Sequence, residues 1–262
     1  MSGRPTQGEA AGWSGSPTIL CRLEDGVFIL TLNRPEARNA VSLDMVEALH
    51  AVFDRLGNVD QGVVVIHGAG EKAFASGADI AELLDRGRRE ALEGINARLF
   101  TRIEELHLVT IAAVEGYALG GGCELALACD LRVGSRTAVF GQPEVGLGIA
   151  PGAGGAWRWT RLIGLSRAKE IVLTARRMHA DEAHAIGLLH RMTPPGEAVS
   201  TALGWARSIL DLDPCALRLT KGILNASPDA TRSALDAMSM AAQAVLFESP
   251  GKKERMSRFL GM

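Results

Sequence analysis

The segment 116–130, GYALGGGCELALACD, places three consecutive glycines before a predicted helix whose first turn carries Glu124. Glycine is unfavourable inside a helix but suits a position where the backbone passes close to another group. The first N–H groups of a helix have no partner within it and lie at the positive end of its dipole. We therefore expect this turn to stabilise a small developing negative charge, such as an enolate oxygen. A nucleotide phosphate fits less well, because no lysine and hydroxyl follow the run as a Walker A motif requires.

Two further segments look over-specified for ordinary loops. Residues 72–80, KAFASGADI, leave a predicted strand and enter a helix, and their small residues offer a second turn with free N–H groups. Residues 140–144, FGQPE, place Glu144 after a proline on a tight turn. Each feature has a plainer explanation when taken alone, since an acid is favourable in a first helical turn and glycines permit close helix packing. Together, the two turns and the two glutamates are candidates for one site.

The elements that must position these residues alternate along the chain. Asp25-Gly26 predicts a hairpin turn between two strands, and Ser42 caps a helix whose apolar residues recur at three and four. Alternation of strands and helices predicts an α/β core with mostly parallel pairing, and after Pro151 the pattern becomes helical with little strand signal. The expected strands lie within 18–32, 63–66, 109–114, 131–133 and 138–140, and the expected helices begin at Leu43, within 80–107 and at the glycine run.

Composition excludes several classes of protein. Hydrophobic residues make up 47% and charged residues 22% of the 262 residues, and the formal charge of −2 gives no electrostatic case for nucleic-acid binding. No apolar run is long enough to span a bilayer, so no membrane partner is expected. The four cysteines form no CxxC pair, which favours a reduced, cytoplasmic setting, and His179, His184 and His190 lack the spacing of a metal site.

Together with LNRPEARNA at 32–40, these segments resemble the enoyl-CoA hydratase/isomerase (crotonase) family in order and spacing. The resemblance covers nearly the whole chain from about Thr18 to Phe259. It implies a spiral of ββα units with a helical C-terminal region that builds trimers, often paired into hexamers. We expect a disordered segment at 1–17, the α/β spiral core at 18–195 and a helical trimerisation region at 196–262.

The resemblance also implies roles for individual residues. The N–H groups of Ala78 and Gly121 correspond to the family's oxyanion hole for the thioester oxygen, and Glu124 and Glu144 to the pair that holds and activates water. Hydration needs a base, a proton source and stabilisation of the carbonyl oxygen, and two carboxylates with two amides supply all three. No metal or cofactor is implied, since coenzyme A is part of the acyl-CoA substrate. The implied substrate contacts are Ala37, Arg38, Ala75, Asp79, Ile80 and Gly120.

The chain departs from the family pattern in three places. Trp157 and Trp159 replace smaller or polar residues of PGAGGTQRL, Ala81 stands where a lysine is frequent, and the usual tail beyond Phe259 is short. We expect altered acyl preference and nucleotide contacts through Arg38 or Lys72. The favoured function is a 2-enoyl-CoA hydratase. The alternatives are a Δ3-Δ2-enoyl-CoA isomerase that uses Glu144 alone and a non-catalytic acyl-CoA-binding protein.

Overall fold

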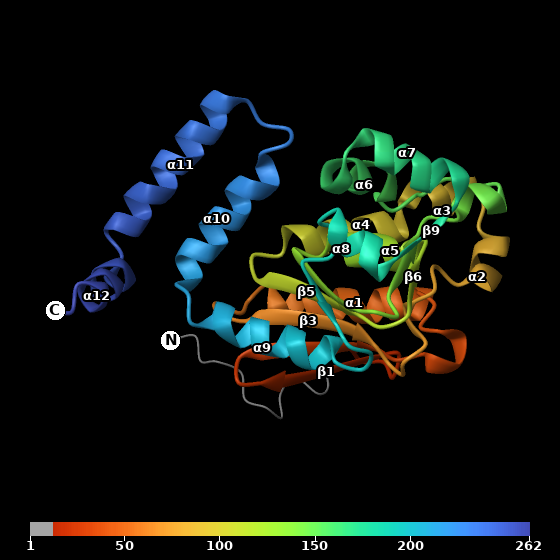
Figure 1. The fold of residues 1–262 in the computed structure, drawn as a ribbon, viewed down its shortest axis with the longest axis horizontal. Helices are drawn as coiled ribbons and strands as arrows, with labels where there is room; N and C mark the ends of the chain where they lie inside the picture. Colours follow the sequence, from red (N-terminus) through yellow and green to blue (C-terminus); the bar gives the residue numbers. More distant parts are fainter. Residues whose placement is uncertain (1–12) are drawn as a thin grey trace.

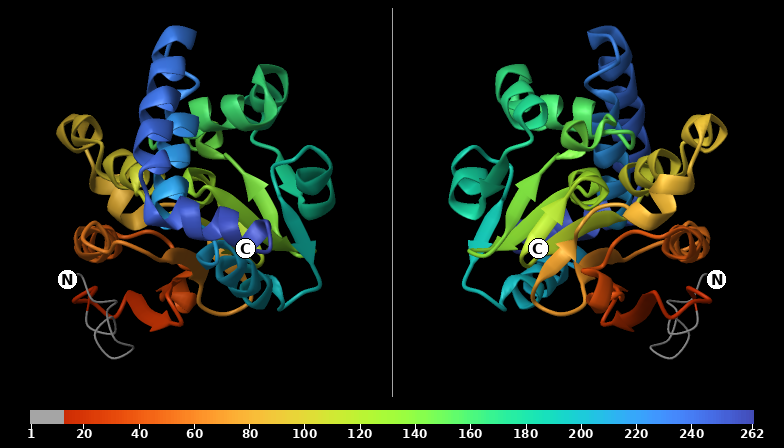
Figure 2. Two further views of the ribbon diagram at one scale, coloured as in Figure 1. Left: turned by 90° about the vertical axis from the view of Figure 1, so that its left-hand side faces the viewer. Right: turned by 90° about the vertical axis from the view of Figure 1, so that its right-hand side faces the viewer.

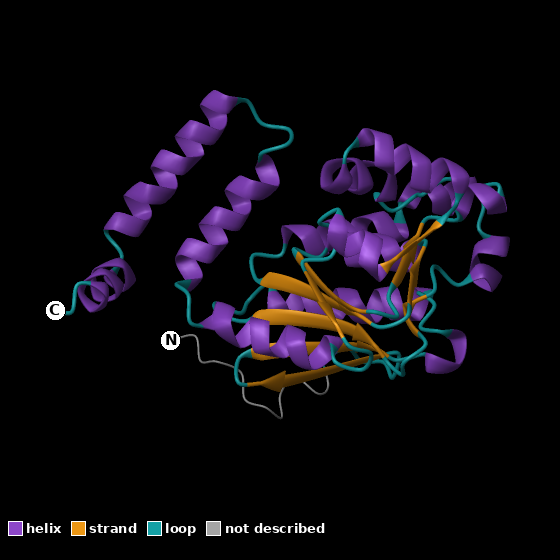
Figure 3. Cartoon of the chain, in the orientation of Figure 1, coloured by secondary structure: helices purple, strands orange, loops and turns teal. Residues whose placement is uncertain are grey.

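A computed structural model describes residues 13–262, which form two β-sheets surrounded by helices (Figure 3). The larger sheet has the order β1-β2-β3-β5-β7-β10 and the smaller one the order β4-β6-β8-β9. The strands are β1 (Ile19–Glu24), β2 (Val27–Leu32), β3 (Val63–Gly68), β4 (Ala73–Ala75), β5 (Val109–Val114), β6 (Tyr117–Leu119), β7 (Leu131–Ser135), β8 (Val139–Gly141), β9 (Arg177–His179) and β10 (Arg191–Thr193).

The helices alternate with these strands and then continue alone to the C-terminus. They are the 3₁₀ turns η2 (Pro35–Ala37) and η3 (Glu144–Leu147) and the α-helices α1 (Leu43–Leu56), α2 (Ile80–Asp85), α3 (Arg88–Glu93), α4 (Ile95–Glu105), α5 (Gly121–Ala128), α6 (Gly155–Ile163), α7 (Leu165–Thr174), α8 (Ala180–Ala185), α9 (Ala198–Leu210), α10 (Pro214–Ala226), α11 (Arg232–Phe247) and α12 (Pro250–Phe259).

Strand pairing follows the expected α/β pattern. β1 and β2 pair antiparallel about Asp25-Gly26, both of which have positive φ, whereas β2, β3, β5, β7 and β10 pair in parallel. The sequence did not reveal β9 and β10, which are short strands within the part predicted to be helical. β9 adds antiparallel to β8, and β10 adds parallel to β7. These two additions complete both sheets.

Successive side chains along each strand point to opposite faces of the larger sheet and so pack into two hydrophobic cores. In β2, Phe28 and Leu30 belong to the larger core with α1, α4 and α5, whereas Val27 and Ile29 face the second core. Helix α9 covers this second face with small side chains, which allows its backbone to lie close to the sheet. The larger core therefore sits between the sheet and the helices that carry the candidate site.

Helix capping explains where the first helices begin and end. Ser42 accepts a hydrogen bond from the Met45 N–H and so starts α1, as predicted. The single helix expected within 80–107 is instead three helices. Gly87 is extended at the first break, and Gly94 has φ +59 at the second, a conformation that ends a helix.

The first described residues pack on the body of the protein. Of the segment 1–17 that was expected to be disordered, residues 1–12 lie outside the described residues. Trp13 is buried and stacks on Phe28 with ring centroids 5.4 Å apart. The packed structure therefore starts before Thr18. At the other end, α11 and α12 form an arm that extends away from the body (Figure 1), and α10 joins it to the body through the buried Lys221, which pairs with Asp130. No helix within residues 13–262 has the length and apolarity needed to cross a membrane.

Candidate functional site

Helix α5 lies near the centre of the molecule, with α2 and α3 on one side and α6 to α8 on the other (Figure 2). Gly120 turns the chain from β6 into this helix with φ +51 and ψ −128, a conformation that requires glycine. Gly122 brings the helix against β4: a Cβ added there would lie 2.1 Å from the carbonyl oxygen of Ala75. The glycine run therefore does permit close packing, and this packing sets the helix start beside the SGAD turn.

The amides of Ala78 and Gly121 lie close together and are free. A Cβ built on Gly121 would lie 3.3 Å from the Ala78 nitrogen, so the two turns approach each other across a gap about one atom wide. Neither N–H donates a hydrogen bond to any part of the chain between residues 13 and 262. Gly121 is the first residue of α5, where the N–H also carries the positive end of the helix dipole. Two unpaired donors beside each other suit an anionic oxygen.

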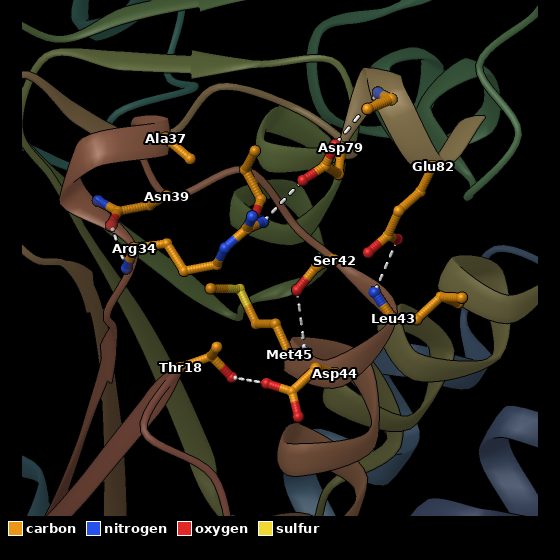
Figure 4. A network of polar contacts seen from close by, with 12 residues as sticks. Thr18, Arg34, Ala37, Asn39, Ser42, Leu43, Asp44, Met45, Asp79 and Glu82 are labelled. Carbon is orange, nitrogen blue, oxygen red and sulfur yellow. Dashed lines mark hydrogen bonds and ion pairs between the residues drawn. The ribbon is translucent and has the colours of Figure 1, made fainter. Parts of the chain in front are cut away.

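The SGAD turn is fixed by the segment that follows β2 (Figure 4). Arg34 donates to a carboxylate oxygen of Asp79 at 3.0 Å and to the carbonyl of Ala40 at 2.8 Å. The backbone of Val41 bonds on both sides of Ala78, accepting from the Asp79 N–H and donating to the Gly77 carbonyl. This pairing leaves the Ala78 N–H itself directed away from Val41.

Asn39 organises the turn that carries Arg34. It is completely buried with φ +55, and its amide donates to the carbonyls of Ala69 and Ala73 while its oxygen accepts from the Arg34 N–H. Asparagine tolerates this left-handed conformation better than most residues. The LNRPEARNA segment therefore holds the SGAD turn in place.

Glu124 is buried in the first turn of α5, with 3% of its surface exposed. One oxygen, Oε1, accepts hydrogen bonds from the N–H of Ala153 at 2.9 Å, in the loop before α6, and from the N–H of Gly155 at 2.7 Å, the first residue of α6. Burial raises the pKa of Glu124, and these two N–H groups together with Arg158 oppose that rise. Two amide donors favour the ionised form, so the geometry suits a carboxylate that accepts a proton.

Glu144 begins the 3₁₀ turn η3 and is 8% exposed. Burial raises its pKa to about 7, and the charge of Glu124 adds to the rise. Its Oε1 accepts a hydrogen bond from Gln142 Nε2 at 2.9 Å. Its Oε2 is buried and has no hydrogen-bond partner among residues 13–262. Glu144 can therefore hold a proton at neutral pH. Its Oε2 is the oxygen that accepts no hydrogen bond from residues 13–262.

Glycines keep the space between these groups open. A Cβ on Gly155 would lie 2.9 Å from both Glu124 Oε1 and Gln142 Nε2, and one on Gly120 would lie 2.9 Å from Glu144 Oε1. The structure therefore brings both glutamates to the start of α5, next to the free amides. All four residues predicted to carry the chemistry meet at one place.

The predicted substrate contacts surround this place but differ in accessibility. Arg38 and Ile80 are exposed, Ala37 is half-buried, and Ala75 and Gly120 are buried. Asp79 is already engaged, because it pairs with Arg34 and caps α2 through the Ala81 N–H. Lys72 is exposed beside β4. Contacts of these residues with coenzyme A stay predictions.

Sequence reasoning missed the residues that support the two glutamates. Gln142 was visible only as a letter of the GQPE motif. Trp159 was noted only as a departure from the family pattern, and in the structure it is completely buried and donates to Gln142. The buried Arg158 pairs with Glu104 at 2.8 Å and bonds the carbonyl of Ala153. A signal was present for Arg158, a charged residue at a position of α6 that the helical pattern makes buried. Gln142, in the loop after β8, and Trp159, an aromatic residue on a buried helix face, carried no such signal. Residues 13–262 contain no cluster of three potential metal ligands.

Comparison with known proteins gives consistent matches. The profile of the enoyl-CoA hydratase/isomerase family matches residues 22–261. A short-chain-enoyl-CoA hydratase of Clostridium acetobutylicum is 38% identical over 92% of this chain and 94% of its own, and a crotonyl-CoA hydratase of Syntrophomonas wolfei is 40% identical over the same shares. The crystal structure of an enoyl-CoA hydratase from Bacillus anthracis superposes with a TM-score of 0.89 at 33% identity, covering 93% of this chain and 96% of that one. The expected crotonase-like fold is confirmed.

Proposed function

The chain belongs to the enoyl-CoA hydratase/isomerase family, and from that premise we propose that it adds water across the 2,3-double bond of a 2-enoyl-CoA thioester. The observation that carries the proposal is the pair of buried carboxylates, Glu124 and Glu144, at the helix end that also presents two free amides. Coenzyme A enters as part of the substrate. No separate metal or redox cofactor takes part.

The free amides stabilise the charge that develops on the thioester oxygen. As water attacks C3, electron density moves through the double bond to the carbonyl oxygen, which becomes enolate-like. The N–H groups of Ala78 and Gly121 donate to this oxygen, and the α5 dipole adds to the field. One such donor typically lowers the barrier by about 3–4 kcal/mol.

The surroundings of the glutamates separate their roles. Glu124 accepts two amide hydrogen bonds and lies near Arg158, so it is the carboxylate that takes a proton from water. Glu144 has a pKa of about 7, so it holds the proton that passes to C2. General acid–base catalysis is most efficient when the pKa of the catalytic group lies near the working pH. Because the carboxylates interact, their titration belongs to the pair.

Purified protein is expected to hydrate crotonyl-CoA without added metal or redox cofactor. The measurement is loss of the enoyl absorbance together with the mass of water gained by the product. Migration of the double bond with no gain of mass would establish the isomerase instead. Tight thioester binding with no turnover on any enoyl-CoA would identify a non-catalytic acyl-CoA-binding protein.

A cytoplasmic location fits the state of the cysteines. Cys21, Cys123, Cys129 and Cys215 are all free thiols, and the first three are buried. Burial raises the pKa of the Cys21 thiol to about 12, so that thiol is unreactive at neutral pH. A reducing compartment is consistent with four unpaired cysteines.

The C-terminal arm supports a trimer or a hexamer. Helices α11 and α12 expose large apolar side chains, including Met240 at 67%, Phe247 at 58% and Phe259 at 91%. Ala242 is the single buried residue of α11, and α12 has none. Large apolar side chains exposed along two successive helices favour a subunit contact over a solvated surface. Light scattering should give a multiple of the 27.8 kDa chain, and a monomer mass at micromolar concentration would contradict the assembly.

A further inference from the structure

A chain of hydrogen bonds runs from helix α6 to one of the candidate catalytic carboxylates. Trp159 Nε1 donates to Gln142 Oε1 at 2.9 Å, and Gln142 Nε2 donates to Glu144 Oε1 at 2.9 Å. Trp159 and Gln142 are both completely buried. The family pattern PGAGGTQRL has leucine at the position of Trp159, and leucine has no N–H to donate.

The indole determines which way the amide of Gln142 faces. An indole nitrogen can only donate, so the group facing it must be the amide oxygen. The amide NH₂ then faces Glu144 and can only donate to it. If the amide rotated by half a turn, its NH₂ would face the indole N–H and its oxygen would face Glu144. The Trp159 N–H therefore makes one of the two orientations much more favourable.

We propose that Trp159 is a positioning residue for Glu144. Through Gln142 it holds Oε1 of Glu144 as a hydrogen-bond acceptor, which leaves Oε2 as the oxygen that carries and transfers the proton. Oε2 is the buried atom without a partner among residues 13–262, so a proton there is free to reach the substrate. A proton on Oε1 would instead be directed at the amide of Gln142. The inference rests on the proposed function for its effect on turnover, but not for its effect on Glu144 itself.

The charged groups near Glu144 do not supply this orientation. Glu124 and the Cys123 thiol on α5 interact with it electrostatically, and Arg158 on α6 is engaged by Glu104. Helix α7 packs against η3, and its charged side chains are exposed: Arg167, Lys169 and Glu170. Gln142 is the side chain that bonds the Glu144 carboxylate within the described residues. The other donor near this carboxylate is the backbone N–H of Glu144 itself, which lowers its pKa, so the side chain that can orient the proton is Gln142.

Trp159→Phe tests the proposal, because phenylalanine fills most of the space but lacks the N–H. Without that donor the amide of Gln142 can turn its oxygen to Glu144. Glu144 then loses a donated hydrogen bond that favours its ionised form, so its pKa rises, by about one pH unit. Turnover of crotonyl-CoA falls by about tenfold with little change in KM, because the proton is held on Oε1.

Infrared titration of the protonated carboxyl band measures the pKa of Glu144 without relying on activity. The Glu144→Gln variant identifies the Glu144 component of that band. In the pH profile for hydration, the alkaline limb should move upward with the pKa, since the reaction needs Glu144 protonated. Titration of Glu144 at the same pH in Trp159→Phe and parent would overturn the proposal, whether or not the protein is a hydratase.

Two further variants separate positioning from packing. Gln142→Leu removes the side chain that links Trp159 to Glu144. Adding Trp159→Phe to this variant should therefore change the pKa of Glu144 no further. Equal effects of Trp159→Phe in both backgrounds would mean that Trp159 does not act through Gln142 and would overturn the proposal. Trp205→Phe on α9 is the matched control, because it makes the same chemical change beside His190 and Arg191. It should leave the Glu144 titration unchanged.

Discussion

Glu144→Gln is expected to hydrate crotonyl-CoA about 10²–10⁴ times more slowly than the parent, and Glu124→Gln should show a loss of the same order. Glutamine keeps the shape and much of the hydrogen bonding of each side chain but cannot hold or accept the transferred proton. Binding of the thioester should persist, because the amides of Ala78 and Gly121 are untouched. Steady-state kinetics and calorimetric binding of a saturated acyl-CoA measure the two properties separately.

The pH dependence of hydration should show which glutamate is responsible for each limb of the profile. In the parent, hydration declines above about pH 7 as Glu144 loses its proton, and declines at low pH as Glu124 gains one. Glu144→Gln should remove the alkaline limb from the residual activity. Glu47→Gln, an exposed position on α1, is the control and should match the parent throughout.

The double variant tests whether the glutamates act as a unit. Groups that serve one step lose their effect together, so Glu124→Gln with Glu144→Gln should be little slower than the worse single variant. Near-full hydration in Glu124→Gln with loss of isomerisation in Glu144→Gln would favour the single-carboxylate isomerase. Parent-like rates in both single variants would show that the catalytic assignment is wrong.

Gly122→Ala should destabilise the fold by at least about 2 kcal/mol, because overpacking a tight contact typically costs that order. Its Cβ would lie 2.1 Å from the carbonyl oxygen of Ala75 and 2.7 Å from the Ala75 side chain. A backbone oxygen cannot turn aside as a flexible side chain can, so α5 must move away from β4. That movement also widens the gap between the Ala78 and Gly121 amides. Urea unfolding at fixed protein concentration measures the loss.

Gly204→Ala provides the matched control for that change. Gly204 lies inside α9 with nothing within 4 Å of its added Cβ. Alanine there should stabilise the helix by roughly 0.5–1 kcal/mol relative to glycine. A Gly122→Ala variant as stable as the parent would mean that β4 and α5 are not held together as the structure has them.

The sequence was informative where one short segment contains both the feature and its cause. Ser42 starts α1, Asp25-Gly26 turns the hairpin, and the glycine run predicted free amides at the start of α5 because helix ends always leave such groups. The residue pattern marked the two turns and the two glutamates as candidates for one site, and the resemblance of four motifs in order then implied the individual roles of Ala78, Gly121, Glu124 and Glu144. Spacing within one motif does not say which loops meet.

The features that the sequence did not predict depend on contacts between segments far apart in the chain. The Trp159 to Gln142 bond joins α6 to the end of β8, and neither residue type alone predicts a partner. Gly94 ends a helix through a left-handed conformation, although an isolated glycine in a helical pattern is often tolerated. β9 and β10 are three residues each, and they are strands because neighbouring edges offer hydrogen bonds.

The support of Glu124 by the start of α6 has a consequence for the order of folding. Helix α5 can pack on the sheet once β7 has been synthesised, but its glutamate receives the Ala153 and Gly155 N–H groups only after a further stretch of chain has emerged. Until then the partly made protein must leave that carboxylate in water or neutralise it, since an unpaired buried charge is strongly unfavourable. Pairing of Glu124 therefore has to wait until the segment that begins α6 has been made, and α6 is the element that completes this part of the candidate site.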